Sequence, residues 1–134
     1  MADTILVTGG AGYIGSHMVK ALRLAGFRPV VLDDLSSGHR SAVRGEELHV
    51  GDVGDAAFVD RVLAEVQPAA VMHFAGFIQV GESVLDPGKY FRNNVTATQV
   101  LLDAMRARDI RRFIFSSTAA IFGEPRYVPI DEAH

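Results

Sequence analysis

The chain has 134 residues, of which 49% are hydrophobic and 22% charged, which is typical of one globular domain or of part of a larger one and excludes a disordered chain. Its net charge of −3 argues against a protein that binds nucleic acid by neutralising phosphates. The absence of cysteine excludes disulfides, zinc–cysteine sites and thiol nucleophiles. Neither a signal peptide nor an apolar run near the ~18 residues of a membrane span is evident, so we expect a cytoplasmic protein without membrane contact.

Five short apolar runs alternate with longer stretches of helical periodicity. The runs cover residues 5–7, 30–32, 48–50, 69–72 and 113–115. Most of them lack polar alternation, which is typical of strands that are buried on both faces of a parallel sheet. The segment 36–47 is polar and contains glycine, so we expect a loop or a short helix there.

Three helices are predicted between these strands. The first covers residues 13–25 and ends at Gly26. The second begins after Asp55, a capping residue, and ends before Pro68. Its apolar face comprises Val59, Val62, Leu63 and Val66. The third has Pro87 in its first turn and carries Phe91, Val95, Thr98, Leu102 and Met105.

The order of these elements predicts an α/β protein with a Rossmann-type, doubly wound parallel sheet. Strands joined by long crossovers are parallel, and such crossovers are right-handed. We expect the strand order 3-2-1-4-5, with the sheet truncated before its last strands. In sheets of this type ligands bind at the carboxyl ends of the strands, so the residues there are the candidate site.

The first strand is followed by a glycine cluster, Thr8-Gly9-Gly10-Ala11-Gly12-Tyr13-Ile14-Gly15. Glycines let the backbone turn tightly and approach a pyrophosphate, and the helix that follows offers free N–H groups to the phosphates. A glycine cluster alone also occurs in plain turns. Here a strand precedes it and an amphipathic helix follows, so we predict a dinucleotide site.

Acidic residues follow the second and third strands. Asp33 and Asp34 stand at the spacing where a carboxylate accepts hydrogen bonds from the adenosine ribose, which favours NAD over NADP. Asp33 could instead cap a helix or turn. Asp52 could accept from the adenine amino group while Val53 packs on the ring, or Asp52 could cap the next helix.

Small and polar residues follow the fourth and fifth strands. Phe74-Ala75-Gly76 would let the backbone pass close to the cofactor, and we interpret His73 as a structural histidine and not a metal ligand or base. The hydroxyls of Ser116-Ser117-Thr118 could orient a substrate or could satisfy local backbone groups. Asn93 and Asn94 lie mid-helix, where asparagine has poor propensity, so we expect one of them to make a polar contact near the cofactor.

These segments, together with Val80-Gly81-Glu82-Ser83-Val84, make the chain resemble the UDP-glucose 4-epimerase (UDP-galactose 4-epimerase) family of extended short-chain dehydrogenases/reductases. The resemblance covers essentially the whole chain. It implies an NAD-dependent isomerase of galactose metabolism that acts on a UDP-hexose, and a homodimer formed through the helix that carries Phe91 and Met105. It implies that Thr118 is the catalytic Ser/Thr. The cofactor-binding residues would be Gly9, Gly12, Tyr13, Ile14, Gly15, Asp33, Asp34, Leu35, Ser36, Ser37, Gly38, Asp52, Val53, Phe74, Ala75, Gly76, Phe77, Ile78 and Asn93.

The sequence departs from the family pattern in several places. Ile78 stands where well-known members have a lysine, and Phe122 replaces a common tyrosine. The family's Tyr-x-x-x-Lys does not occur within residues 1–134, so we expect these residues to be an incomplete NAD-binding domain without the sugar-nucleotide domain and inactive alone. Two alternatives stay open. One is a 4,6-dehydratase, which Ala119-Ala120 after Thr118 disfavours, and the other is a non-catalytic dinucleotide-binding module.

Overall fold

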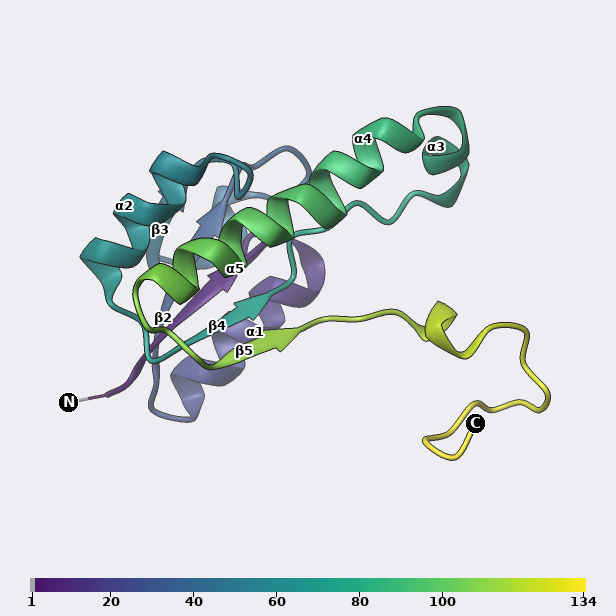
Figure 1. The fold of residues 1–134 in the computed structure, drawn as a ribbon. Coiled ribbons are helices and arrows are strands. Elements are labelled where there is room, and N and C mark those ends of the chain that lie inside the picture. The colour runs from purple at the N-terminus through teal and green to yellow at the C-terminus, as the bar shows by residue number, and fades with distance from the viewer. Residues whose placement is uncertain (1) are drawn as a thin grey trace.

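The computed structural model describes residues 2–134, apart from the side chain of residue 119. Strands and helices alternate along the chain (Figure 1). In chain order the elements are β1 (Thr4–Thr8), α1 (Tyr13–Leu24), β2 (Arg28–Asp33), η1 (Arg40–Val43), β3 (Glu47–Val50), α2 (Ala56–Val66), β4 (Ala70–His73), α3 (Val80–Leu85), α4 (Pro87–Phe91), η2 (Arg92–Thr96), α5 (Ala97–Ala107), β5 (Phe113–Phe115) and η3 (Ala119–Phe122). All five predicted strands are present, and η1 is the short helix expected in the segment 36–47.

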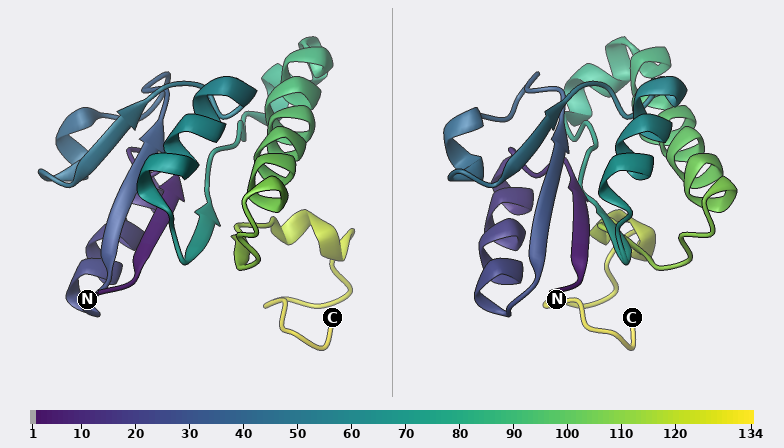
Figure 2. Two further views of the ribbon diagram at one scale, coloured as in Figure 1. Left: turned by 60° about the vertical axis from the view of Figure 1, so that its left-hand side comes forward. Right: turned by 90° about the vertical axis from the view of Figure 1, so that its left-hand side faces the viewer.

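The five strands form one parallel sheet in the order β3-β2-β1-β4-β5, which confirms the predicted topology. Side chains of β1 alternate between the two faces: Leu6 packs in the cluster that α2 and α5 cover, and Ile5 and Val7 pack in the cluster that α1 covers. Figure 2 shows α1 on one side of the sheet and α2 with α5 on the other. Burial on both faces explains why the strands read as continuous apolar runs.

The predicted ends of the first two helices are confirmed. α1 stops where Gly26 takes a φ of +86°, a left-handed conformation that glycine adopts without strain. The Asp55 carboxylate caps α2 by accepting a hydrogen bond from the N–H of Phe58 at 3.0 Å. All four predicted apolar residues of α2 are buried.

The third helix is observed as α4, η2 and α5 in succession, with Pro87 in its first turn as predicted. η2 is a π-helical turn, which adds a residue to the turn and rotates the helix that follows. The apolar residues that we named for this helix do not share one face. Met105 is buried against the sheet, whereas Phe91, Val95 and Leu102 are exposed. The buried residues of α5 are Ala97, Leu101 and Met105.

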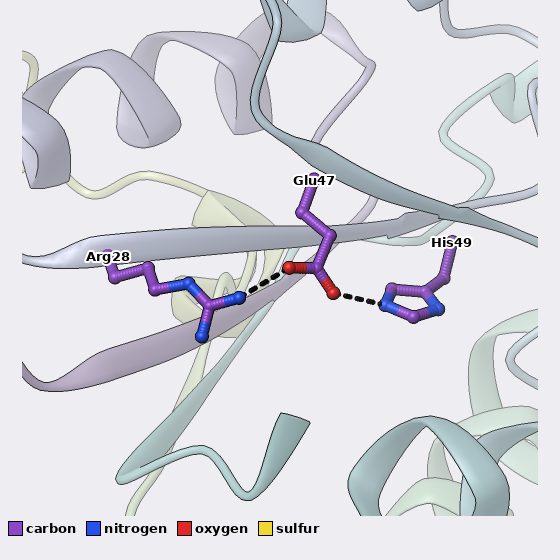
Figure 3. A network of polar contacts seen from close by, with 3 residues as sticks. All are labelled: Arg28, Glu47 and His49. Carbon is purple, nitrogen blue, oxygen red and sulfur yellow. Dashed lines mark hydrogen bonds and ion pairs between the residues drawn. The ribbon is translucent and has the colours of Figure 1, made fainter. Parts of the chain in front are cut away.

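An ion-pair network joins the edge strand β3 to β2 (Figure 3). Glu47 on β3 accepts hydrogen bonds from Arg28 on β2 and from His49 Nε2, the latter at 2.9 Å. The hydrogen bond from His49 and the nearby Arg28 guanidinium hold the pKa of Glu47 below its usual value. Glu47 stands on an edge strand, where charge discourages pairing with another chain.

Candidate functional site

The glycine cluster forms a tight turn between β1 and α1. Gly9 has a φ of +70°, and a Cβ atom there would lie 2.5 Å from the backbone nitrogen of Ala75. A Cβ atom on Gly15 would overlap the carbonyl oxygen of Gly9. Glycine is therefore required at both positions because a side chain would collide with neighbouring backbone atoms, and not only because the turn needs a flexible residue.

The first turn of α1 has backbone N–H groups that the helix leaves unpaired. α1 has 12 residues and its N-cap is Gly12, so the N–H groups of Tyr13, Ile14 and Gly15 have no partner within the helix. The side chains of Tyr13 and Ile14 are 84% and 60% exposed. Free N–H groups and the positive end of the helix dipole make this turn suited to bind an anionic group such as a pyrophosphate.

Asp33, at the end of β2, holds the glycine turn in place. Its Oδ2 accepts a hydrogen bond from the N–H of Ala11 at 2.9 Å, and its Oδ1 accepts one from the N–H of Leu35 at 2.8 Å. The residue is only 7% exposed. Each carboxylate oxygen keeps a second lone pair, so Asp33 can still accept from a hydroxyl group. Sequence reasoning considered a turn-capping role and a ribose role as alternatives, and the geometry accommodates both together.

The loop after Asp33 lies against the same turn. The N–H of His39 donates to the carbonyl oxygen of Ala11 at 3.0 Å, and a Cβ atom on Gly38 would come within 2.8 Å of the Ala11 carbonyl carbon. Asp34 accepts from the N–H and the hydroxyl of Ser36. Gly38 is thus brought beside the glycine turn, and Leu35 is joined to the turn through Asp33.

Asp52 and Val53, which follow β3, differ in their surroundings. Asp52 is exposed, and its Oδ1 accepts from the N–H of Gly54 at 2.7 Å. The cap of α2 is Asp55, so the alternative of Asp52 as a helix cap is wrong. Val53 is 6% exposed and belongs to the core under α2 and α5. Most of the Val53 side chain therefore packs in the core, and only its small exposed part could contact a ligand.

The segment after β4 runs directly against the glycine turn. The N–H of Phe74 donates to the carbonyl oxygen of Thr8 at 2.9 Å, and Ala75 is the residue that a Cβ atom on Gly9 would strike. Phe74 and Ala75 pack on opposite core clusters, whereas Gly76 and Ile78 are exposed. The structure thus brings Phe74 and Ala75 of this segment beside β1 and the glycine turn.

His73 is fixed by hydrogen bonds at both ring nitrogens. Nδ1 lies 2.6 Å from the hydroxyl of Thr8 and Nε2 lies 3.0 Å from the hydroxyl of Thr98. The residue is 2% exposed, and this burial lowers its pKa to about 4. A neutral histidine with a hydrogen bond at each ring nitrogen agrees with the structural role that we predicted for His73.

Of the two mid-helix asparagines, Asn94 makes the tertiary contact. Its side-chain amide exchanges two hydrogen bonds with the backbone of Phe77, and it also accepts one from Asn93 Nδ2 at 2.8 Å. Asn93 was the predicted site residue, and Asn94 was missed as a member of the site. Both lie in the π-helical turn η2, a kind of distortion that is frequent at functional sites and that no residue pattern announced.

Thr118 lies after β5 and is exposed. Its hydroxyl accepts from the N–H of Ala120 at 3.2 Å and caps η3. Figure 1 shows η3 beyond the end of β5, apart from the sheet and its helices. The chain of residues 2–134 thus places Thr118 at the predicted edge of the sheet without bringing it to the glycine turn.

Two further classes of site are absent from the described residues. Within residues 2–134, no three histidine, aspartate or glutamate side chains stand close enough to hold a metal ion. Nor does any helix of that range combine the length and the apolar character that crossing a membrane requires.

The comparisons with known proteins agree on one family. Residues 5–134 match the family described as NAD dependent epimerase/dehydratase. A UDP-glucose 4-epimerase of Rhizobium leguminosarum bv. trifolii is 52% identical over 132 residues, which are 98% of this chain and 40% of that protein. The human UDP-glucose 4-epimerase is 41% identical over 148 residues, covering 100% of this chain and 42% of that protein.

Solved structures give the same result. The crystal structure of a UDP-glucose 4-epimerase from Brucella ovis in complex with NAD matches 98% of this chain and 41% of its own, with a TM-score of 0.92 and 50% identity. One from Bifidobacterium longum in complex with NAD+ and UDP matches with a TM-score of 0.91 and 38% identity, covering 96% of this chain and 41% of its own. The chain thus spans roughly two fifths of the length of the proteins that it matches.

Proposed function

The chain belongs to the NAD dependent epimerase/dehydratase family, and from that membership we propose that residues 1–134 are the NAD-binding part of a UDP-glucose 4-epimerase. The observation that carries the proposal is the glycine turn, which Asp33 holds at the exposed start of α1. The crystallised relatives with NAD in complex support the choice of cofactor. In this proposal the sugar-nucleotide domain of the family lies outside residues 1–134, and the UDP-hexose binds where the two domains meet.

Each part of the site then has a role in binding. The N–H groups of Tyr13 and Ile14 would bind the pyrophosphate. Asp33 would accept from the adenosine ribose with its remaining lone pairs, and Asp52 would face the adenine. The segment from Phe74 to Ile78, with Asn93, would line the nicotinamide side. The clashes that a Cβ atom would cause at Gly9 and Gly15 show that this surface tolerates no side chains there.

The proposed reaction is epimerisation at the sugar C4. Bound NAD would accept a hydride from C4 of the UDP-hexose and return it to the other face, by way of a 4-keto sugar. Thr118 would orient the 4-hydroxyl and then the 4-carbonyl through its hydroxyl. The proton of the 4-hydroxyl needs a base, which the family pattern places in a Tyr-x-x-x-Lys. Tyr13, Tyr90 and Tyr127 are the tyrosines of this chain, and none has a lysine four positions later. We therefore propose that residues 1–134 bind NAD but do not epimerise sugars by themselves.

We also propose a homodimer through the exposed side of the helix that runs from α4 to α5. Phe91, Val95 and Leu102 are 67%, 54% and 42% exposed on it. These three side chains lie on one continuous run of helical segments, and exposed apolar patches mark interaction sites. Met105, which we first assigned to the same surface, is buried in the core and takes no part in the proposal.

Titration of NAD and NADP into the protein tests the cofactor assignment. Because a 2′-phosphate would lie beside the Asp33 carboxylate, we expect NAD to bind more tightly by about tenfold or more. Gly15→Ala should abolish binding of both, since its Cβ atom would overlap the Gly9 carbonyl, whereas Lys20→Ala, exposed on the same helix, should change neither affinity. Equal or tighter binding of NADP would overturn the assignment.

A further inference from the structure

Asn94 pairs with Phe77 as one strand residue pairs with another. Its Oδ1 accepts from the N–H of Phe77 at 2.8 Å, and its Nδ2 donates to the Phe77 carbonyl oxygen at 2.9 Å. Turning the amide over would set donor against donor and acceptor against acceptor, so its orientation is determined. The second lone pair of Oδ1 accepts from Asn93 Nδ2 at 2.8 Å. One side chain thus fixes the backbone at Phe77 and the rotation of the Asn93 amide.

The backbone of Asn94 is in turn fixed from the interior of the protein. The hydroxyl of Thr98 donates its single proton to the Asn94 carbonyl oxygen at 2.9 Å. Thr98 must therefore accept from His73 Nε2–H at 3.0 Å, which leaves His73 Nδ1 to accept from the hydroxyl of Thr8 at 2.6 Å. The donor and acceptor of each hydrogen bond in this series follow from the donation by Thr98 to Asn94. A continuous chain of hydrogen bonds joins β1 and β4 to the π-helical turn.

Phe77 is held by its side chain as well. Its ring meets the ring of Tyr90 at 5.6 Å, and Lys89 Nζ lies 4.9 Å above it. Lys89 and Tyr90 both bond to Glu82 of α3. The segment after β4 is therefore anchored at Phe74 by the sheet and at Phe77 by Asn94, with the part that touches Gly9 between these anchors.

We propose that Asn94 is a positioning residue that shapes the nicotinamide half of the NAD site and leaves the adenosine half unaffected. The proposal rests on the proposed function. The adenosine half consists of the glycine turn, Asp33 and Asp52, and no hydrogen bond of Asn94 reaches these residues in the described chain. The nicotinamide half consists of the Phe77 segment and Asn93, which Asn94 holds directly.

The test compares two ligands that share one half of the site. ADP occupies the adenosine half alone and NAD occupies both halves. Calorimetric titration of each ligand into the full-length, nucleotide-free polypeptide therefore measures the contribution of each half to affinity. For Asn94→Ala we expect NAD affinity to fall by about tenfold, the effect of losing a pair of partly buried hydrogen bonds, while ADP affinity stays within about twofold. Gln99→Ala, at an exposed position of α5, is the matched control and should change neither affinity.

A second pair of variants covers the case in which Asn94→Ala does not fold. Thr98→Val removes the hydroxyl that fixes Asn94 and should lower the ratio of NAD to ADP affinity, and Thr98→Ser, which keeps the hydroxyl, should restore it. A residue that only stabilised the fold would lower the melting temperature and leave this ratio unchanged. Wild-type binding of both ligands with an unchanged ratio in the variants overturns this inference alone. Failure of the wild type to bind either ligand overturns the proposed function and this inference with it.

Discussion

Replacing Asp33 with asparagine tests whether its carboxylate holds the glycine turn. Both oxygens accept backbone N–H groups, a buried one from Ala11 at 2.9 Å and a partly buried one from Leu35 at 2.8 Å. An amide has nearly the same shape, but one of its ends is an NH2 group. Whichever way it turns, one of the two N–H groups then faces another donor. An unsatisfied buried donor costs about 1–3 kcal/mol, and the partly buried N–H of Leu35 costs less than that of Ala11. We therefore expect Asp33→Asn to lower the free energy of unfolding by about 1 kcal/mol.

Urea unfolding followed by circular dichroism measures this loss. Asp34→Asn is the matched control, because Asp34 is the next residue and also accepts a backbone N–H, from Ser36, but is exposed to water. Its effect should stay within about 0.5 kcal/mol. Equal unfolding midpoints for Asp33→Asn and the wild type, or equal losses in the two variants, would refute the argument from buried donors.

Three other predictions follow from features of the site and the surface. Burial lowers the pKa of His73 from 6.5 to about 4, so as the pH falls through this range the unfolded chain binds a proton before the folded chain does. Stability should therefore fall between pH 7 and pH 5 by about 2 kcal/mol in urea titrations, and His73→Gln should show a flatter profile. In the longer enzyme that we propose, Thr118→Val should reduce turnover by about one to three orders of magnitude at normal NAD content. Unchanged turnover would show that Thr118 acts only as the N-cap of η3. Residues 1–134 alone should not interconvert UDP-glucose and UDP-galactose, and measured interconversion would refute this claim. The same polypeptide should self-associate through Phe91, Val95 and Leu102, and a monomer in sedimentation experiments would refute that.

The features that could be predicted from sequence are those that depend on local patterns. Apolar runs without polar alternation indicated buried parallel strands, and Gly26, Asp55 and Pro87 marked helix ends where the structure has them. The strand order followed because parallel crossovers permit few topologies. Asp33 could be located from its place after β2, although its bonds to the glycine turn depend on where β1 and β2 end in space.

The features that could not be predicted depend on contacts distant in the chain. Periodicity assumes a regular helix, so it did not predict the π-helical turn at Arg92–Thr96. It also did not predict that Met105 is buried while Leu102, on the same helix α5, is exposed. The short helix α3 was missed because its apolar residues are exposed and leave no buried face to read. Asn94 gave one signal, its poor helix propensity, which could not distinguish it from Asn93.

The central strand β1 has a consequence for how the chain folds during synthesis. β1 pairs with β2 on one side and with β4 on the other, and the bonded residues Thr8 and His73 are 65 positions apart. At about 5–20 residues per second, a ribosome takes about 3–13 s to make the intervening chain. During the part of that interval that follows the synthesis of residue 33, β1 can pair with β2 while the side of β1 that later meets β4 has no neighbour. Such an edge is a template for strands of other nascent chains, so conditions that slow translation between β2 and β4 should increase misassembly of this protein.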